Sequence, residues 1–224
     1  MWQLYQFPLC PFSRKVRLLL GEKGVGYELK RESPWAPTDE FLDMNPAGQT
    51  PVMVDASRPG PPLIDSMAIC EYFEETVDKA AMINGTAANR AEIRRLVAYF
   101  DTVFYRYVTA PLLHERMEKR LANLGAPSST AMRESMKAAN EQLDYVAFLL
   151  DHRNWLAGAT MSLADLAAAA QISVVDYLGG IDWRGHEQAA RWYRGLKSRP
   201  SFRPLLSERM EMIPPAPHYA DVDF

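Results

Sequence analysis

A cysteine followed three residues later by a serine is the pair in this sequence best suited to chemistry. Cys10 stands between an alternating stretch, residues 2–7, that predicts a short strand and a run from Pro11 that predicts a helix. The unpaired amides and the dipole of a helix N-terminus favour an anion such as the Cys10 thiolate. Because Ser13 replaces the second cysteine of a redox Cys-x-x-Cys, a mixed disulfide at Cys10 could not be resolved within the motif. The alternative is that Cys10 is a small core residue, and this stretch leaves both interpretations open.

Two more segments of the first half have chemistry suited to a ligand. Pro51 opens a predicted strand, so Thr50 is extended and its backbone N–H and C=O are free to pair with an extended, peptide-like molecule. Asp65 and Ser66 precede an apolar helical run, and amides at such a helix start suit a carboxylate. Either residue could equally be a simple N-cap.

The composition excludes several classes of protein. The 224 residues are 48% hydrophobic and 24% charged, which is typical of a globular chain. No apolar run approaches the ~18 residues that cross a bilayer, so we expect no membrane partner. The net charge is −3 with dispersed basic residues, so we expect no nucleic acid partner. Two cysteines fit a reducing compartment, which predicts a cytoplasmic protein, and the four histidines have no spacing that suggests a metal site.

The order of elements predicts two domains followed by a tail. Strand, helix, strand in residues 2–31 predicts a parallel pair with a right-handed crossover. From Ala87 to the start of the tail the pattern is helical, with a kink or interruption at Pro111. We therefore expect a mixed α/β domain over residues 1–78, a linker over 79–86, an all-helical domain over 87–212 and a stiff, extended tail over 213–224.

The order of several motifs resembles the glutathione transferase family over nearly the whole chain. The motifs are Leu9–Arg14, Asn45–Val52, Asp65–Ile69, Trp155–Gly158 and Ser162–Asp165. The resemblance implies a thioredoxin-like α/β N-terminal domain, an all-α C-terminal bundle and a homodimer.

The resemblance also implies roles for individual residues. Cys10 falls at the family's catalytic position, with Ser13 beside it, and the Cys-Pro-Phe sequence is similar to omega-like members that favour thiol transfer. The implied glutathione-binding residues are Phe12, Thr50, Pro51 as a cis-proline, Asp65 and Ser66. Glutathione would then be a substrate, with no other cofactor.

Two features depart from a transferase. Residues 33–49 contain no Lys or Arg and instead carry Asp39, Glu40 and Asp43, which oppose an anionic tripeptide. The tail resembles the end of the transferase-like FtsZ-binding proteins of alphaproteobacterial cell division, which share the Cys-Pro-Phe-Ser-Arg opening and need no chemistry. That resemblance implies the FtsZ polymer as a partner.

Residues suited to partner binding follow from this. In the tail, Tyr219 and Phe224 would be anchors and Asp221 and Asp223 would supply charge, unless the tail is simply frayed. Elsewhere, Trp35 is either a core plug or an exposed anchor, and Arg116, with Lys119 and Arg120, is either a solvated face or a contact for an acidic polymer. Our main hypothesis is an FtsZ-binding protein with little or no catalysis, and the competing one is an omega-like thiol transferase that uses Cys10 and glutathione.

Overall fold

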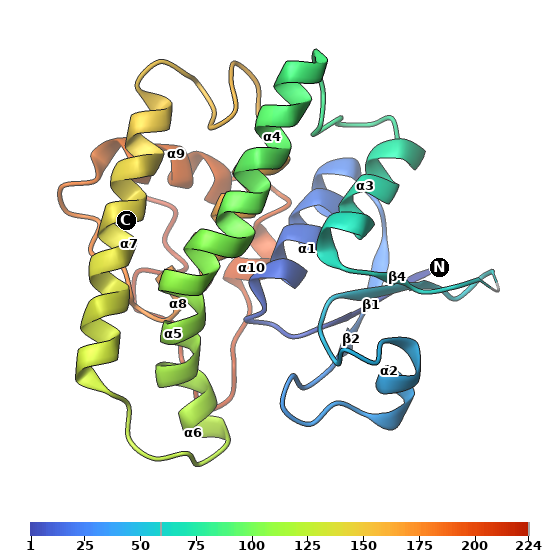
Figure 1. The fold of residues 1–224 in the computed structure, drawn as a ribbon, viewed down its shortest axis with the longest axis horizontal. Helices are drawn as coiled ribbons and strands as arrows, with labels where there is room; N and C mark the ends of the chain where they lie inside the picture. The colour runs from blue at the N-terminus through green and yellow to red at the C-terminus, as the bar shows by residue number, and fades with distance from the viewer. Residues whose placement is uncertain (59, 224) are drawn as a thin grey trace. The chain divides into compact units, whose positions relative to one another are not determined.

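The chain folds into two compact units. The computed structural model describes residues 1–58 and 60–223, and the units are Met1–Met82 and Ile83–Phe224 (Figure 1). The division between them lies inside the segment 79–86.

The first unit is a four-stranded sheet with three helices. Its elements are β1 (Trp2–Gln6), α1 (Pro11–Lys23), β2 (Tyr27–Arg31), α2 (Asp39–Met44), β3 (Val52–Asp55), β4 (Leu63–Ile64) and α3 (Ser66–Thr76). The strand order is β2-β1-β3-β4. The predicted parallel pairing of β1 with β2 is confirmed, and β3 runs antiparallel to both β1 and β4.

Local chemistry fixes the ends of α1. Cys10 is the N-cap, Pro11 fills the first helical position, and Gly24 ends the helix in the left-handed conformation at φ 69°. A proline loses nothing at that first position because its missing N–H has no intrahelical partner there, whereas glycine takes a positive φ without a Cβ clash. The helix therefore begins directly after the thiol, as the sequence predicts.

The regular elements of the second unit are helices in the part of it that the structure describes. Its elements are α4 (Ala87–Tyr99), η1 (Phe100–Thr109), α5 (Ala110–Leu113), η2 (His114–Glu118), α6 (Lys119–Leu121), α7 (Ser129–Leu150), α8 (Leu163–Tyr177), α9 (Glu187–Lys197) and α10 (Arg203–Leu206). Every residue of α8 is buried, and this helix packs against α4 and η1. Figure 1 shows α7, in yellow, alongside the green run from α4 to α6.

Pro111 does not interrupt the long helix, contrary to one of our two expectations for it. The chain stays helical from Ala87 to Leu121 because the turns before and after α5, η1 and η2, are π-helical. The Ala110 N–H donates to the Tyr105 carbonyl, five residues back. This wider hydrogen-bond pattern accommodates a proline that a regular α-helix interior would not.

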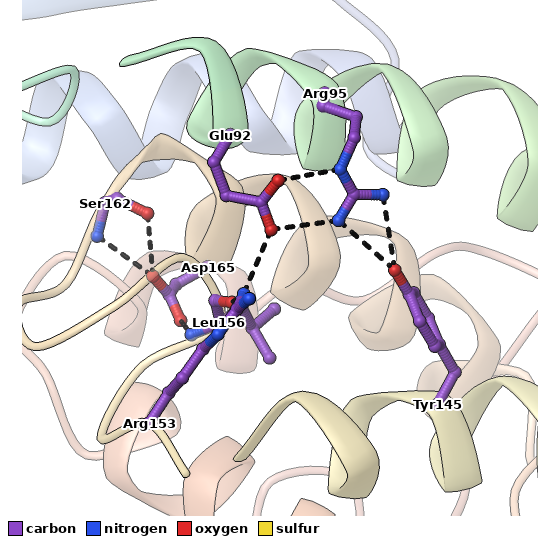
Figure 2. A network of polar contacts seen from close by, with 7 residues as sticks. All are labelled: Glu92, Arg95, Tyr145, Arg153, Leu156, Ser162 and Asp165. Atoms are coloured by element: carbon purple, nitrogen blue, oxygen red, sulfur yellow. Dashed lines mark hydrogen bonds and ion pairs between the residues drawn. The ribbon is translucent and has the colours of Figure 1, made fainter. Parts of the chain in front are cut away.

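A charged network joins α4 to α7 and to the loop after α7 (Figure 2). The Glu92 carboxylate accepts hydrogen bonds from Arg95 Nε and Nη2 at 2.8 and 2.9 Å and from Arg153 Nη1 at 3.0 Å. The Arg95 guanidinium lies 3.4 Å from the Tyr145 hydroxyl. Hydrogen bonds from Arg95 hold the pKa of Glu92 below its ordinary value. The network therefore fixes the loop that leads to α8.

A buried aspartate organises the start of α8. Asp165 accepts from the Ser162 N–H at 2.9 Å, from the Ser162 hydroxyl at 3.0 Å and from the Leu156 N–H at 2.9 Å (Figure 2). The Trp192 indole on α9 donates to the same carboxylate at 3.0 Å. Ser162 and Asp165 therefore form a capping box with Asp in place of Glu, and the same aspartate also holds α9.

Candidate functional site

The Cys10 thiol lies at the N-terminus of α1 in a half-buried position. Its Sγ accepts a hydrogen bond from the Ser13 N–H at 3.4 Å and lies 3.5 Å from the Thr50 carbonyl oxygen, to which it donates. The sulfur therefore has one amide donor and one carbonyl acceptor as its hydrogen-bond partners. The position therefore allows nucleophilic sulfur chemistry.

The Thr50–Pro51 peptide bond is cis, in agreement with the conformation that the resemblance implies. The Thr50 carbonyl, which we expected to be free, accepts a hydrogen bond from the Cys10 thiol. The Thr50 N–H has no hydrogen-bond partner among residues 1–58 and 60–223. One backbone donor beside the sulfur is thus available to an extended peptide-like ligand.

Asp65 and Ser66 lie at the same end of the sheet as Thr50. Val52 pairs with Ile64 across β3 and β4, so the residues that precede β3 and follow β4 meet at one edge. Asp65 has φ 78° and accepts from the Met67 and Ala68 N–H groups at 2.7 and 3.1 Å. Its N-cap role is therefore real, and the carboxylate remains solvent-exposed. Ser66 is buried.

Two side chains of the Cys10 motif complete this edge. Phe12 is half-buried, and the buried Ser13 hydroxyl has no hydrogen-bond partner in the described structure. The residues that the resemblance assigns to glutathione therefore share one edge, and the free Thr50 N–H fits the backbone of a tripeptide. None of these assigned residues is positively charged, and residues 33–49 contain no Lys or Arg.

Helix α2 presents a negatively charged surface. Asp39, Glu40 and Asp43 are all exposed. Burial, together with the Glu40 carboxylate 3.4 Å away, raises the pKa of the Tyr5 hydroxyl. An anionic ligand is disfavoured near this helix.

Trp35 is packed on one side and partly exposed. Its ring packs edge-on against Phe7, with 5.2 Å between centroids, and 39% of the residue is still exposed. The ring is therefore neither a fully buried core residue nor a fully exposed one.

The tail is not extended, and Tyr219 is not an exposed anchor. Tyr219 is fully buried, its hydroxyl donates to the Leu205 carbonyl at 3.1 Å, and its ring packs edge-on against Tyr177. The Ala216 N–H donates to the Tyr177 carbonyl at 2.8 Å. The tail's prolines prevent a helix but do not prevent docking, because an aromatic ring gains more from burial than from solvent exposure.

A buried polar cluster that we did not expect holds the tail. Asp176, on α8, lies 2.9 Å from His218 Nε2 and 3.7 Å from Lys197 Nζ, and the side chains of Asp176 and Lys197 are fully buried. Lys197 donates to the Asp221 carbonyl at 2.6 Å. An aspartate near the end of a largely apolar helix was the available signal, since buried carboxylates need partners.

The remaining expected contacts are only partly free. Asp221 and Asp223 are exposed, whereas Phe224 lies outside the described residues. Arg116 is half-buried and donates to the Leu178 carbonyl at the end of α8, and Arg120 is exposed.

In residues 1–58 and 60–223, no group of three His, Cys, Asp or Glu side chains is arranged to hold a metal ion. No helix in the same part of the chain has the length and apolarity required to span a bilayer.

Comparison with known proteins gives consistent results. A family model described as "Glutathione S-transferase, N-terminal domain" matches residues 9–76. FtsZ-localized protein A of Caulobacter vibrioides is 45% identical over 222 residues, which cover 99% of this chain and 97% of that protein. A crystal structure of a glutathione S-transferase from Rhodospirillum rubrum F11 is 46% identical, with a TM-score of 0.96 and full coverage of both chains. The structure of FzlA from C. crescentus is 44% identical, with a TM-score of 0.96, and covers 100% of this chain and 99% of that one.

Proposed function

This chain belongs to the glutathione S-transferase family, and we propose that within the family it is a cell-division factor that binds FtsZ filaments with little or no catalysis. The predicted fold, a thioredoxin-like α/β unit followed by a helical bundle, is confirmed. The observation that carries the proposal is the 45% identity, over 99% of this chain, to a protein named for its localisation with FtsZ.

The folded tail supports the proposal in a modified form. Because Tyr219 is buried and Lys197 holds the Asp221 carbonyl, the contact residues we propose in the tail are Asp221, Asp223 and Phe224. A segment already held at its base loses less entropy when it binds than a free terminus does. Trp35, Arg116 and Arg120 are our further candidates for partner contact.

Weak catalysis follows from the electrostatics of the Cys10 edge. Glutathione is an anion, and the helix beside the edge presents three exposed carboxylates. The Asp65 carboxylate is already engaged by two backbone amides. Both features reduce the affinity expected for glutathione.

The Cys10 geometry favours a second candidate function, an omega-like thiol transferase. In that reaction the Cys10 thiolate attacks a glutathione mixed disulfide, which forms a Cys10–glutathione disulfide and releases the substrate as a thiolate. A second glutathione thiolate then attacks that bond, giving oxidised glutathione and the free Cys10 thiolate. The Ser13 N–H on Sγ is the observation that supports this chemistry.

Co-sedimentation with FtsZ filaments tests the main proposal. We expect the full chain to pellet with filaments and a chain lacking Asp223 and Phe224 to remain in the supernatant. A matched control, Glu141→Gln with Phe148→Ala, removes one exposed carboxylate and one exposed ring from α7 and should pellet normally. Full pelleting of the shortened chain would refute the tail contact, and no pelleting of the full chain would refute the function.

Glutathione titration and a thiol-transfer assay test the second candidate. Saturable binding together with turnover that Cys10→Ser abolishes would establish the transferase. Absence of turnover in the unaltered chain would exclude it. In either case we propose a homodimer that acts in the cytoplasm, and light scattering of the purified chain tests the dimer.

A further inference from the structure

The helical unit contains a cavity of about 550 Å³ that the Cys10 edge does not involve. It lies where α6, the start of α7, the end of α8 and the first residues of the tail come together. Its lining includes Arg116, Arg120, Met132, Leu178, Ile213 and Pro214. The size is within the range of ligand-binding clefts.

The charged side chains that line the cavity are both arginines. Arg116 is held in place through the Leu178 carbonyl, while Arg120 is exposed and has no hydrogen-bond or ion-pair partner among residues 1–58 and 60–223. Two carboxylates on the same helical run as these arginines are already engaged, Glu115 with Lys119 at 2.8 Å and Glu118 with His114 at 2.8 Å. The guanidinium of Arg120 is therefore available to an anionic group.

Apolar surface continues beyond the cavity. Leu124 and Met212 are 59% and 56% exposed, and each directly precedes a lining residue, Gly125 and Ile213. Exposed apolar side chains beside a basic cavity are typical of a surface that contacts another protein, because a small ligand would leave them in water.

The cavity is also continuous with the base of the tail. Ile213 and Pro214 form part of its wall, and the Ala216 N–H is bonded to the Tyr177 carbonyl. A Cβ placed on Gly179 would lie 3.3 Å from Arg116 Nη1 and 3.5 Å from the Ala216 Cβ, so the arginine and the tail flank the same turn. A partner seated in the cavity would therefore lie next to the tail segment.

We propose that this cavity binds a short acidic peptide segment of the filament partner, with an apolar side chain against Met132 and Ile213 and a carboxylate against Arg116 and Arg120. The inference rests on the proposed function and assigns to it a second contact, separate from Asp223 and Phe224. The two arginines favour an acidic ligand because their charges are complementary to it. The exposed apolar residues beside the cavity favour a peptide over a small anion, because a peptide can cover them.

Charge reversal at Arg120 tests the contact in the full chain. We expect Arg120→Glu to weaken co-sedimentation with FtsZ filaments about tenfold, because a positive charge that attracts the acidic peptide is replaced by a negative charge that repels it. Met132→Asp should weaken it similarly. Lys137→Glu, on the same helix α7 with a side chain 81% exposed, should bind as the unaltered chain does. Unchanged binding by both cavity variants would overturn the inference while leaving the proposed function intact.

A peptide titration separates the cavity from the tail and from small anions. The probe is a fluorescein-labelled Asp-Leu-Asp-Phe amide, with Lys-Leu-Lys-Phe amide and benzoate as comparison ligands. We expect the acidic peptide to bind, Arg120→Glu to abolish that binding, and deletion of Asp223 and Phe224 to leave it unchanged. Binding of benzoate without the peptide, or equal binding of both peptides, would overturn the inference even where the chain pellets with filaments.

Discussion

Lys197 Nζ lies 2.6 Å from the backbone carbonyl oxygen of Asp221, and the lysine side chain is fully buried. The same ammonium is 3.7 Å from the Asp176 carboxylate and lies over the rings of Tyr193 and Tyr219, 5.6 and 5.7 Å from their centroids. Burial lowers the pKa of Lys197, and attraction to Asp176 opposes that shift. A buried cation thus ties α9 to the tail.

Replacing this cation should loosen the tail and destabilise the helical unit. Lys197→Met removes the hydrogen-bond donor of the Asp221 carbonyl and one of the charged partners of Asp176. We therefore expect the free energy of unfolding to fall by about 3 kcal/mol. Urea denaturation measures it. Lys137→Met, on an exposed side chain, should change the same quantity by less than about 0.5 kcal/mol. Equal stability of the two variants would show that the buried lysine does not anchor the tail.

The contribution of His218 to stability should depend on pH. The hydrogen bond to Asp176 raises the pKa of His218, although partial burial and the charge of Lys197 oppose it. A pKa raised by folding means that the stabilisation is complete below the ordinary value of about 6.5 and disappears as pH rises through the folded-state value. His218→Gln should therefore be less stable than the unaltered chain at about pH 5.5, with the difference shrinking by about pH 9.

Thermal unfolding of both chains across this pH range measures that difference. Groups that do not interact with His218 cancel in the comparison, so the remaining pH dependence belongs to His218 and its contacts with Asp176 and Lys197. A constant difference in stability would contradict the prediction.

Asp165 should be among the least replaceable side chains in the helical unit. It is fully buried and accepts four hydrogen bonds, from Leu156, twice from Ser162 and from Trp192. Burial raises the pKa of its carboxyl, which the four donors oppose. Asp165→Ala leaves all four donors without their acceptor, so we expect a loss of about 3–5 kcal/mol in unfolding free energy.

Two comparisons sharpen this test. Asp165→Asn keeps one acceptor oxygen and should be intermediate between the alanine variant and the unaltered chain. Asp151→Ala, at an exposed position after α7, should be nearly neutral. If Asp165→Ala unfolds at the same denaturant concentration as Asp151→Ala, the four hydrogen bonds do not stabilise the fold.

The two cysteines should differ in reactivity in the native protein. Cys10 is half-buried at a helix end, whereas Cys70 is fully buried inside α3. Ellman's reagent should therefore titrate one thiol in the folded chain and two in denaturant. Cys10→Ser should leave no native reactivity, and rapid reaction of a second thiol without denaturant would contradict the burial of Cys70.

Local chemistry explains which parts of the fold the sequence could predict. The Cys10–Pro11 start and Gly24 end of α1 depend on residues that are neighbours in the chain, and so does the Ser162–Asp165 box. The shared edge of Thr50 and Asp65 follows from a short hairpin. Each of these features could therefore be predicted from the sequence alone.

The tail shows why the rest could not be predicted. Its folding depends on Asp176 and Lys197, which lie 42 and 24 residues from their tail partners. Nothing near Tyr219 in sequence indicates that Tyr177 and Leu205 surround it. The cavity beside Arg120 has the same origin, since its walls come from segments far apart in the chain.

Stability and partner binding should separate within the tail. Tyr219→Ala removes a fully buried ring and its hydrogen bond to Leu205, so we expect a loss of about 3–5 kcal/mol of unfolding free energy. Deleting Asp223 and Phe224 leaves Tyr219 and the Lys197–Asp221 contact in place, so unfolding should change by less than about 0.5 kcal/mol. Denaturation and filament co-sedimentation of the same two variants measure both quantities. A shortened chain as unstable as Tyr219→Ala would mean that the last two residues support the fold, and that their removal cannot be used to isolate the contact with the filament.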